Sequence, residues 1–491
     1  KENYIEQLIK SHVIVNPEDR KKAILSSGND LTKNLGLIFN PKENLLEEVC
    51  NIIETPFLFI GSFEEEYLSL PNQILELTMI KQQKYFPLYN QDGSLSKNFL
   101  GVSNIPIKNN LQIIKGNERV LKARLSDARF FFDNDMKKGL NKLSRNLENI
   151  IFHRSLGTMK MKMGRVSFIV EKYSKIFNAD IKLALISTKL CKADLCSEVV
   201  YEMPELQGRI GSIYALAEEL PNQVSVAINE HYSPLGPSDK CPSIEESAVL
   251  SLSDKLDSLV GFIAIDMKAT GSKDPFGLRR SCLGVIRILL ERKIRLSISD
   301  IINDSYDSYS KQGINLKLSK DETNKSTIHF IYERLRVFLK DKGLSQSALQ
   351  AVFEVSNNLD IVNDVNKVEA LDKLMSDPKG KEFLSILKRV RRILSIEENK
   401  DNVEIKSDVQ EKLLVQKEEI TLYKMHFKYS EIIKDLIVKE EYTDAMKSFA
   451  VISTELEKFF ENVQVNIENK DLRINRLKLL FKSDLYLEIQ R

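Results

Sequence analysis

The chain has 491 residues, of which 42% are hydrophobic and 29% are charged, and its formal net charge is +2. This length predicts several domains rather than one core, and the hydrophobic content excludes wholesale disorder. Because the net charge is close to zero, no global field attracts nucleic acid, and any RNA binding has to come from local clusters of cations.

The cysteines and histidines are few and scattered. Five of each are present, and no two cysteines form a Cys-x-x-Cys pair, which argues against a zinc site and suits free thiols in a reducing compartment. No apolar run approaches the roughly 20 residues that span a bilayer. We therefore expect a cytoplasmic protein without a metal or a membrane partner. Because Lys1 opens directly into a helical pattern, we also expect that a preceding part is missing.

The first 110 residues predict helices followed by an α+β segment. Residues 1–35 have a helical pattern that is expected to break near 27–29, and a short helix is expected over 44–53. Apolar runs at 56–61 and 67–71 are bounded by helix breakers and predict short strands. Residues 87–95 predict a hairpin that turns at Asp-Gly, with an apolar strand following from Phe99.

Helical patterns dominate from Asn117 onwards. An apolar stripe at spacings of three and four predicts an amphipathic helix near Val166–Ile176. The polar segment 321–325 is a candidate domain boundary. Further helices are expected over 183–196, 245–265, 327–340, 344–354, 365–375, 381–396, 407–438, 441–462 and 471–488.

Two basic segments in the first 150 residues are candidate RNA contacts. Lys84 and Tyr85 lie beside the predicted hairpin, where the ring could stack on a nucleotide and the ammonium could contact phosphate. The alternative is an aromatic strand end that packs on the core. In the helical segment 116–132, Arg119, Lys122 and Arg129 would share one face, which could follow an RNA backbone.

Arg124 projects elsewhere on the same segment. The alternative for all four cations is a solvated charged face with acidic neighbours as partners.

The segment 273–280 is expected to open a helix, with Asp274 as N-cap and Pro275 at the first helical position. Arg279 and Arg280 then occupy the first turns, where cations are poorly placed relative to the helix dipole. This placement predicts a partner for them, which could be a distant acid, a subunit surface or RNA.

The C-terminal helices carry the remaining basic candidates. Lys388 and Arg391 belong to the dense basic face of 388–394, and Arg473 and Arg476 share a helix face through their i, i+3 spacing. The alternative is a generic helical bundle with a basic exterior.

Residues 160–300 resemble HD-type phosphohydrolases in a degenerate form. Such enzymes hold metal through histidines and aspartates, but here the His-Asp position reads Ala193-Asp194 with Lys192 before it, and Asp254 is the other retained position. The Lys192 ammonium suits an ion pair with Asp194 better than a divalent cation. No phosphate-binding loop, dinucleotide fingerprint, class I synthetase motif or Ser-His-Asp set is present, so no catalytic residue is expected.

Taken in order, these motifs resemble one family over essentially the whole chain, namely the beta subunit of bacterial two-subunit glycyl-tRNA synthetase. The segments that carry the resemblance are 82–87, 116–132, 156–158, 192–195, 207–208, 273–280 and 472–477. The C-terminal helices also resemble the anticodon-binding domain of arginyl- and glycyl-type synthetases. The family's beta subunit is usually longer at its N-terminus.

The resemblance implies a multidomain, predominantly α chain. It comprises an α+β body (1–150), a degenerate HD-type helical domain (151–325) and a helical-bundle anticodon-binding domain (326–491). It further implies a partnership with a catalytic alpha subunit in an alpha2beta2 enzyme. In that enzyme the alpha subunit uses ATP and Mg²⁺ to activate glycine, while the beta subunit binds tRNA-Gly and no cofactor of its own.

Two other functions stay open at this point. One is an active HD-type phosphohydrolase fused to RNA-binding helices. The other is a tRNA-binding scaffold that is not part of a synthetase.

Overall fold

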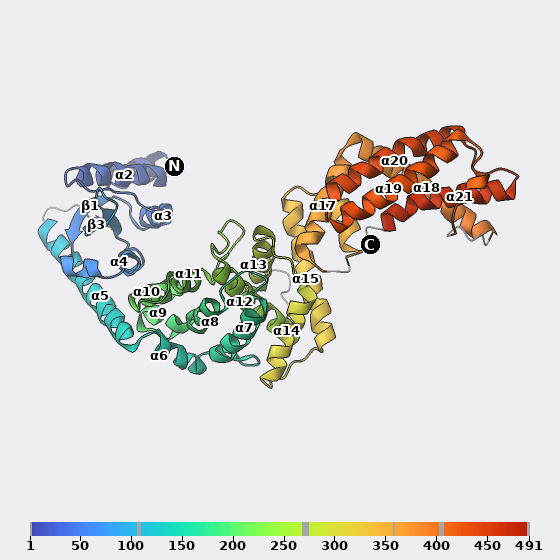
Figure 1. Cartoon of the computed structure of the whole chain (residues 1–491). Coiled ribbons are helices and arrows are strands. Elements are labelled where there is room, and N and C mark those ends of the chain that lie inside the picture. The colour runs from blue at the N-terminus through green and yellow to red at the C-terminus, as the bar shows by residue number, and fades with distance from the viewer. Residues whose placement is uncertain (1, 106–109, 268–273, 357–358, 402–406, 489–491) are drawn as a thin grey trace. The chain divides into compact units, whose positions relative to one another are not determined.

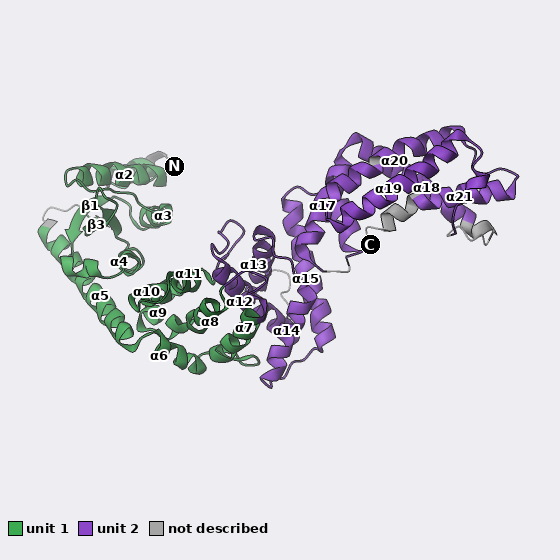
Figure 2. Cartoon of the chain, viewed as in Figure 1, with its two compact units in different colours: residues 1–171, 180–232 green, residues 172–179, 233–491 purple. Residues whose placement is uncertain are grey.

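The computed structural model describes residues 2–105, 110–267, 274–356, 359–401 and 407–488. The chain divides into two compact units, which are residues 1–171 with 180–232 and residues 172–179 with 233–491 (Figure 2). Helices make up most of both units, and every strand of the described part belongs to the first (Figure 1). The predominantly α class with an α+β segment near the N-terminus is confirmed.

A three-stranded antiparallel sheet organises the first part of unit 1. Strands β1 (Phe57–Ser62) and β2 (Phe86–Tyr89) both pair with the central strand β3 (Leu95–Ser103). The connection between β2 and β3 contains Asp92 and Gly93, and the φ of Gly93 is 82°, which glycine adopts without steric cost. The predicted hairpin is therefore confirmed.

Helices cover both faces of this sheet. Successive side chains of a strand point to opposite faces, so Phe99 and Leu100 of β3 enter different cores. Phe99 packs with the apolar residues of α5 (Asn110–Lys138). Leu100 packs with those of α2 (Pro17–Lys33) and α3 (Glu43–Ile52). The sheet thereby fixes the position of α5, which carries several of the basic candidates.

Two phenylalanines of the sheet lie over glycines of the neighbouring strand. Phe99 faces Gly61 and Phe59 faces Gly101, and both pairs are directly opposite in the β1–β3 ladder. A Cβ atom would lie 2.4 Å from the ring at Gly61 and 2.2 Å at Gly101. Each ring therefore occupies the space that a side chain on the opposite strand would need.

Two expectations for this region are wrong. Helix α2 runs unbroken through 27–29, because Gly28 lets the Phe39 ring pack where a Cβ would lie 2.4 Å from it. The helix begins instead at Pro17, after the Asn16 side chain accepts a hydrogen bond from the Glu18 N–H. The helix that precedes it is α1 (Glu2–Lys10).

The strand expected at 67–71 is also wrong. Residues 65–69 form the 3₁₀ helix η1 (Glu65–Ser69), because Tyr67 and Leu70, three residues apart, both face the same core.

The rest of unit 1 is helical apart from one short ladder. Val166, Ile169, Val170 and Tyr173 form the buried stripe of α7, as predicted, whereas Ile176 lies beyond the helix and is 43% exposed. The elements in order are α6 (Leu140–Arg145), β4 (Ile151–His153), β5 (Gly157–Thr158), α7 (Met159–Tyr173), α8 (Ile181–Leu190), α9 (Glu198–Glu202), α10 (Arg209–Ala217) and α11 (Asn222–Glu230).

Unit 2 consists of helices throughout its described part. The helix expected to begin at 407 begins only at 417, and α15 runs continuously through the domain limit expected at 325/326; the domain limits themselves stay predictions. The helices are α12 (Glu245–Ala264), α13 (Leu278–Glu291), α14 (Ile298–Lys311), α15 (Lys320–Asp341), α16 (Gln346–Phe353), α17 (Ile361–Ser376), α18 (Pro378–Asp401), α19 (Lys417–Val438), α20 (Tyr442–Asn462) and α21 (Lys470–Glu488).

Replacing Gly28 by alanine is expected to destabilise the protein by about 1–3 kcal/mol, because the new methyl group overlaps the Phe39 ring. Urea unfolding followed by circular dichroism measures the change. The matched control is Gly116→Ala in α5, where a Cβ meets nothing within 4 Å. Better helix propensity is expected to stabilise that variant by up to about 1 kcal/mol. Equal effects of the two substitutions would contradict the packing argument.

Candidate nucleic-acid interface

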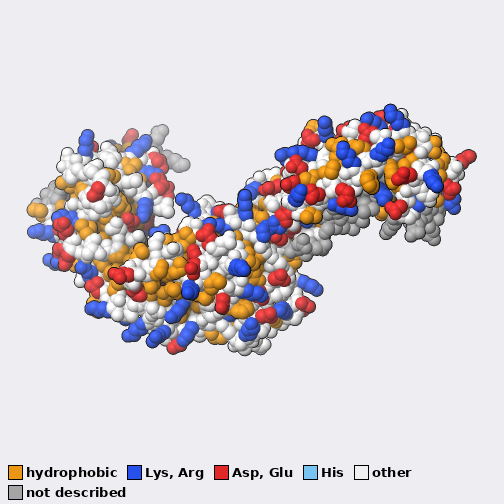
Figure 3. Space-filling model, in the orientation of Figure 1, with side chains coloured by type: hydrophobic (Ala, Val, Ile, Leu, Met, Phe, Trp, Pro, Cys, Tyr) orange, Lys and Arg blue, Asp and Glu red, His pale blue; other side chains and the backbone are white. Residues whose placement is uncertain are grey.

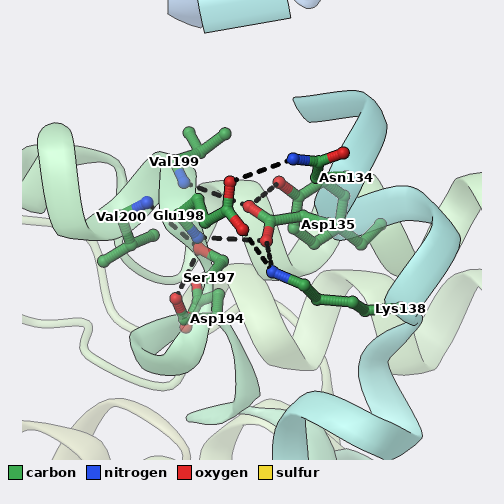
Figure 4. Close-up of polar contacts among 9 residues, drawn as sticks. Asn134, Asp135, Lys138, Asp194, Ser197, Glu198, Val199 and Val200 are labelled. Atoms are coloured by element: carbon green, nitrogen blue, oxygen red, sulfur yellow. Dashed lines mark hydrogen bonds and ion pairs between the residues drawn. The ribbon is translucent and has the colours of Figure 1, made fainter. Parts of the chain in front are cut away.

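A buried carboxylate anchors the C-terminal half of α5. Asp135 is fully buried and accepts hydrogen bonds from the N–H groups of Glu198 and Val199, both at 3.0 Å, and from the Tyr214 hydroxyl at 3.1 Å (Figure 4). The Lys138 ammonium lies 3.7 Å from the same carboxylate and also pairs with Glu198. These contacts join α5 to α9 and α10, so α5 presents its outer face in one fixed orientation.

The structure separates the α5 candidates into two kinds. Lys122 pairs with Glu64, and the Arg129 guanidinium donates 3.0 Å hydrogen bonds to the Glu66 carbonyl and the Ser69 hydroxyl. These two cations hold α5 against the segment around η1. Arg119 and Arg124 are exposed and have no ion pair within the described ranges. Of the four α5 candidates, these two remain open to a phosphate.

The stacking role expected for Tyr85 does not fit the structure. The tyrosine is 6% exposed, its ring stacks on Phe99 at 4.5 Å, and its hydroxyl donates to Asn117. Burial raises the pKa of its phenol to about 12. The core-packing alternative therefore describes Tyr85 in this chain. Lys84 is half-buried and pairs with Glu48 at 2.6 Å.

The start of α13 differs from its expected capping pattern. Gly277, in the left-handed conformation, is the N-cap, so Asp274 and Pro275 precede the helix. Asp274 nevertheless caps the helix N-terminus. Its carboxylate accepts hydrogen bonds from the N–H groups of Leu278 and Arg279 at 2.8 and 2.9 Å. Lys273 lies outside the described residues.

The two arginines of this helix start have no acidic partner in the described part of the chain. Arg280 is exposed and Arg279 is partly exposed. Of the partners that the sequence left open, the subunit surface and RNA remain for them.

The degenerate HD positions are buried and structurally engaged. Lys192 lies 3.7 Å from the Tyr232 ring centroid, and one Asp194 oxygen accepts from the N–H groups of Gly208 and Gly211. The other Asp194 oxygen has no hydrogen-bond partner among the described residues, and burial raises the pKa of this carboxyl to about 6. Asp254 is also buried, at 7% exposure, on α12 of the other unit. Across the described ranges, no group of three His, Cys, Asp or Glu side chains is arranged to hold a metal ion.

The arginines of α21 do not face solvent as expected. Arg476 is 6% exposed, and its guanidinium pairs with the buried Glu419 and donates to the Gln464 carbonyl at 2.8 Å. A guanidinium enclosed in this way cannot reach an RNA phosphate, and its role is to join α21 to α19. Arg473 pairs with Glu397 of α18.

Helix α18 carries one set of open cations in this helical region. Lys381, Lys388 and Arg392 share one face through spacings of seven and four, and Arg389 flanks them with its guanidinium 4.3 Å from the Phe460 ring centroid. All four are exposed, and none has an ion pair among the described residues. We call these four residues the α18 basic stripe; Arg391 is exposed on a neighbouring face.

Sequence reasoning singled out Lys388, included Arg389 and Arg392 only as part of the basic segment 388–394, and missed Lys381. The helical spacing of 381, 388 and 392 was the available signal. Figure 3 shows that Lys and Arg side chains on the visible face are interspersed with Asp and Glu. An aromatic was missed too: Phe427 of α19 is 76% exposed and lies between the unpaired Lys424 and Lys428.

Exposed cations without acidic partners are suited to contacts with nucleic-acid phosphates. Residues 1–354 match the family described as "Glycyl-tRNA synthetase beta subunit", and residues 386–487 match the "DALR anticodon binding domain". These matches place the chain among the aminoacyl-tRNA synthetases.

More narrowly, the chain belongs to the glycyl-tRNA synthetase beta subunit family. It is 36% identical to the glycine–tRNA ligase beta subunit of Ruegeria sp. (strain TM1040) over 98% of this chain and 69% of that protein. It is also 36% identical to the subunits of the same name from Rhodospirillum centenum and Paracoccus denitrificans, again over 98% of this chain, and it covers 67% and 69% of those proteins. No helix in the described ranges is long and apolar enough to cross a membrane.

The pKa of Asp194 predicts a pH-dependent contribution to stability. The folded carboxyl titrates at about 6 and the unfolded one near 3.9, so the folded chain binds this proton more tightly and loses stability as the pH rises between these values. Asp194→Asn keeps the acceptor for Gly208 and Gly211 but cannot ionise. The variant is expected to match the wild type near pH 4 and to exceed its unfolding free energy by about 2–3 kcal/mol near pH 8.

Urea unfolding of both proteins across this pH range measures the difference between their unfolding free energies. Groups that titrate alike in both proteins do not contribute to this difference. A difference that does not change with pH would show that Asp194 titrates alike in the folded and unfolded chains.

Proposed function

We propose that this chain is the tRNA-binding beta subunit of a glycine–tRNA ligase. With a catalytic alpha subunit it supports the ATP-dependent attachment of glycine to tRNA-Gly. The observation that carries this function is the match to the beta subunit family over nearly the whole chain. The anticodon-binding match over 386–487 adds the RNA-binding role and includes most of α18 with three of the four stripe residues.

The α18 basic stripe is suited to the RNA backbone. Phosphate contacts supply most of the affinity of a protein for nucleic acid, and cations that have no acid beside them are the ones free to make such contacts. Lys381, Lys388 and Arg392 extend over three turns of one helix face, which matches a run of phosphates better than a single anion. The exposed Arg119, Arg124 and Arg280 and the partly exposed Arg279 are further candidate contacts.

The partners and cofactors follow from this function. The alpha subunit binds ATP and Mg²⁺ and activates glycine, while this chain binds tRNA-Gly and supplies no catalytic residue. Two copies of each subunit form the enzyme, and it acts in the cytoplasm. The buried Lys192 and Asp194 serve the packing of the degenerate HD-type region.

The phosphohydrolase alternative fits the structure poorly. Asp194 is the residue at the His-Asp position. It is buried, and one of its oxygens accepts hydrogen bonds from two backbone N–H groups. A tRNA-binding scaffold outside the synthetases is distinguished by glycylation. The alpha subunit should attach glycine to tRNA-Gly only when the full-length protein that contains this chain is added. Tight tRNA binding without such activation would support the scaffold.

Neutralising the stripe with Lys388→Gln and Arg392→Gln together is expected to weaken binding of tRNA-Gly about tenfold. It should also reduce the slope of log affinity against log salt by about one for each cation that contacts a phosphate. The KM for tRNA should rise, while glycine-dependent exchange between ATP and pyrophosphate on the alpha subunit stays unchanged. Filter binding across a salt series and steady-state glycylation measure these effects.

Lys447→Gln is the matched control, because Lys447 is an exposed lysine of the same helical region that already pairs with Asp444 at 2.7 Å. The assignment of the stripe fails when the double variant keeps both the affinity and the salt slope of the wild type.

A further inference from the structure

Unit 2 contains a cavity of about 290 Å³ among α16, α17, α20, the end of α19 and the turn between α19 and α20. Its walls are partly apolar, with Val352, Leu371, Met446 and Phe449 among the lining residues, and partly polar. Pockets for whole small-molecule ligands measure about 300–1,000 Å³. The volume here lies close to the lower limit of that range, which suits one planar ring system.

A buried amide supplies a hydrogen-bond donor at this cavity. Asn363 is 5% exposed and lines the cavity, and its carbonyl oxygen accepts a hydrogen bond from the Tyr442 hydroxyl at 2.6 Å. Its amide nitrogen has no hydrogen bond within the part of the chain that the structure describes. This nitrogen is accessible from the cavity and not enclosed by protein, so it is available to an acceptor atom of a ligand.

The charged groups at the cavity favour a ligand that accepts hydrogen bonds. Lys367 lines the cavity, with its ammonium 5.8 Å from the Tyr442 ring centroid. The Glu440 carboxylate also lines it, but both of its oxygens are taken by the Arg295 guanidinium. The polar side of the cavity therefore offers donors from Asn363 and Lys367, while its acid is already neutralised.

We propose that this cavity receives one unstacked base of the bound tRNA, with the acceptor edge of the base directed to Asn363 and Lys367. Bases in single-stranded RNA loops are recognised in this way, with their faces against apolar side chains and their edges hydrogen-bonded. This inference rests on the proposed function and adds to it a place where sequence is read.

The cavity and the basic stripe are linked through one packing contact. Phe449 of the cavity wall stacks on Phe383 of α18, with ring centroids 5.7 Å apart and planes at 12°. Helix α18 thus has phosphate-binding groups on its exposed face and supports the cavity wall from its buried face. The stripe positions the RNA backbone without regard to sequence, whereas the cavity selects a base.

The test combines a filled cavity with RNAs that each lack one base. Ala351 lines the cavity from an exposed position on α16, so Ala351→Phe fills the mouth without overpacking the core. Asn363→Asp keeps the acceptor for Tyr442 and removes the donor. Gln346→Phe is the control, because it adds the same ring at an exposed position of the same helix away from the cavity.

The probes are tRNA-Gly and variants of it with an abasic site at each anticodon-loop position in turn, and binding is measured with the full-length protein. One abasic position is expected to weaken wild-type binding about tenfold or more. Ala351→Phe and Asn363→Asp should each weaken binding of intact tRNA-Gly to a similar degree and should be insensitive to loss of the base at that position. Gln346→Phe should behave as the wild type does, and thermal unfolding verifies that all variants are folded.

The base-binding role of the cavity is overturned if both cavity variants bind tRNA-Gly with wild-type affinity. It is also overturned if, at every abasic position, the loss of affinity from the missing base adds to the loss from the cavity substitution. In those cases the wild type still binds tRNA-Gly and activates glycylation, so the proposed function stands. A wild-type protein that binds no tRNA-Gly overturns both.

Discussion

The buried carboxylate of Asp135 is the contact on which the first unit depends. It gathers two backbone N–H groups and a tyrosine hydroxyl that burial would otherwise leave without partners. These groups belong to α9 and α10, whereas the opposite half of α5 packs on the sheet. One helix therefore belongs to two cores at once, and the orientation of every charge on it is set by tertiary contacts and not by its own sequence.

Ion pairs decide which cations of the chain are available to a partner. Lys122 and Arg476 look alike in the sequence, since each lies on a basic helical segment. Their acids, Glu64 and Glu419, are 58 and 57 residues away along the chain. Helical spacing identifies the face of a residue, but it cannot identify an acid brought in by the fold. For the open cations of α18, the described part of the chain supplies no such acid.

The parts of the fold that were predicted are those set by local chemistry. The Asp-Gly hairpin and the stripe of α7 follow from a turn conformation and a helical period. The failures arise from contacts distant in sequence. Gly28 resembles a helix breaker but makes room for Phe39, and Tyr85 resembles a stacking aromatic but lies against Phe99. Asp274 was expected to be the N-cap residue of α13, but Gly277 is the N-cap and Asp274 caps the helix from a position before it.

The two phenylalanine–glycine pairs between β1 and β3 have an evolutionary consequence. Each ring, Phe59 or Phe99, fills the space denied to the opposite glycine, Gly101 or Gly61. A change at either member of a pair removes the fit that the other requires, so a larger residue at the glycine is accessible only after the ring has become smaller. Among descendants of this sequence, the two members of each pair are therefore expected to change together or not at all. Where they change, the substitution of the phenylalanine precedes that of the glycine.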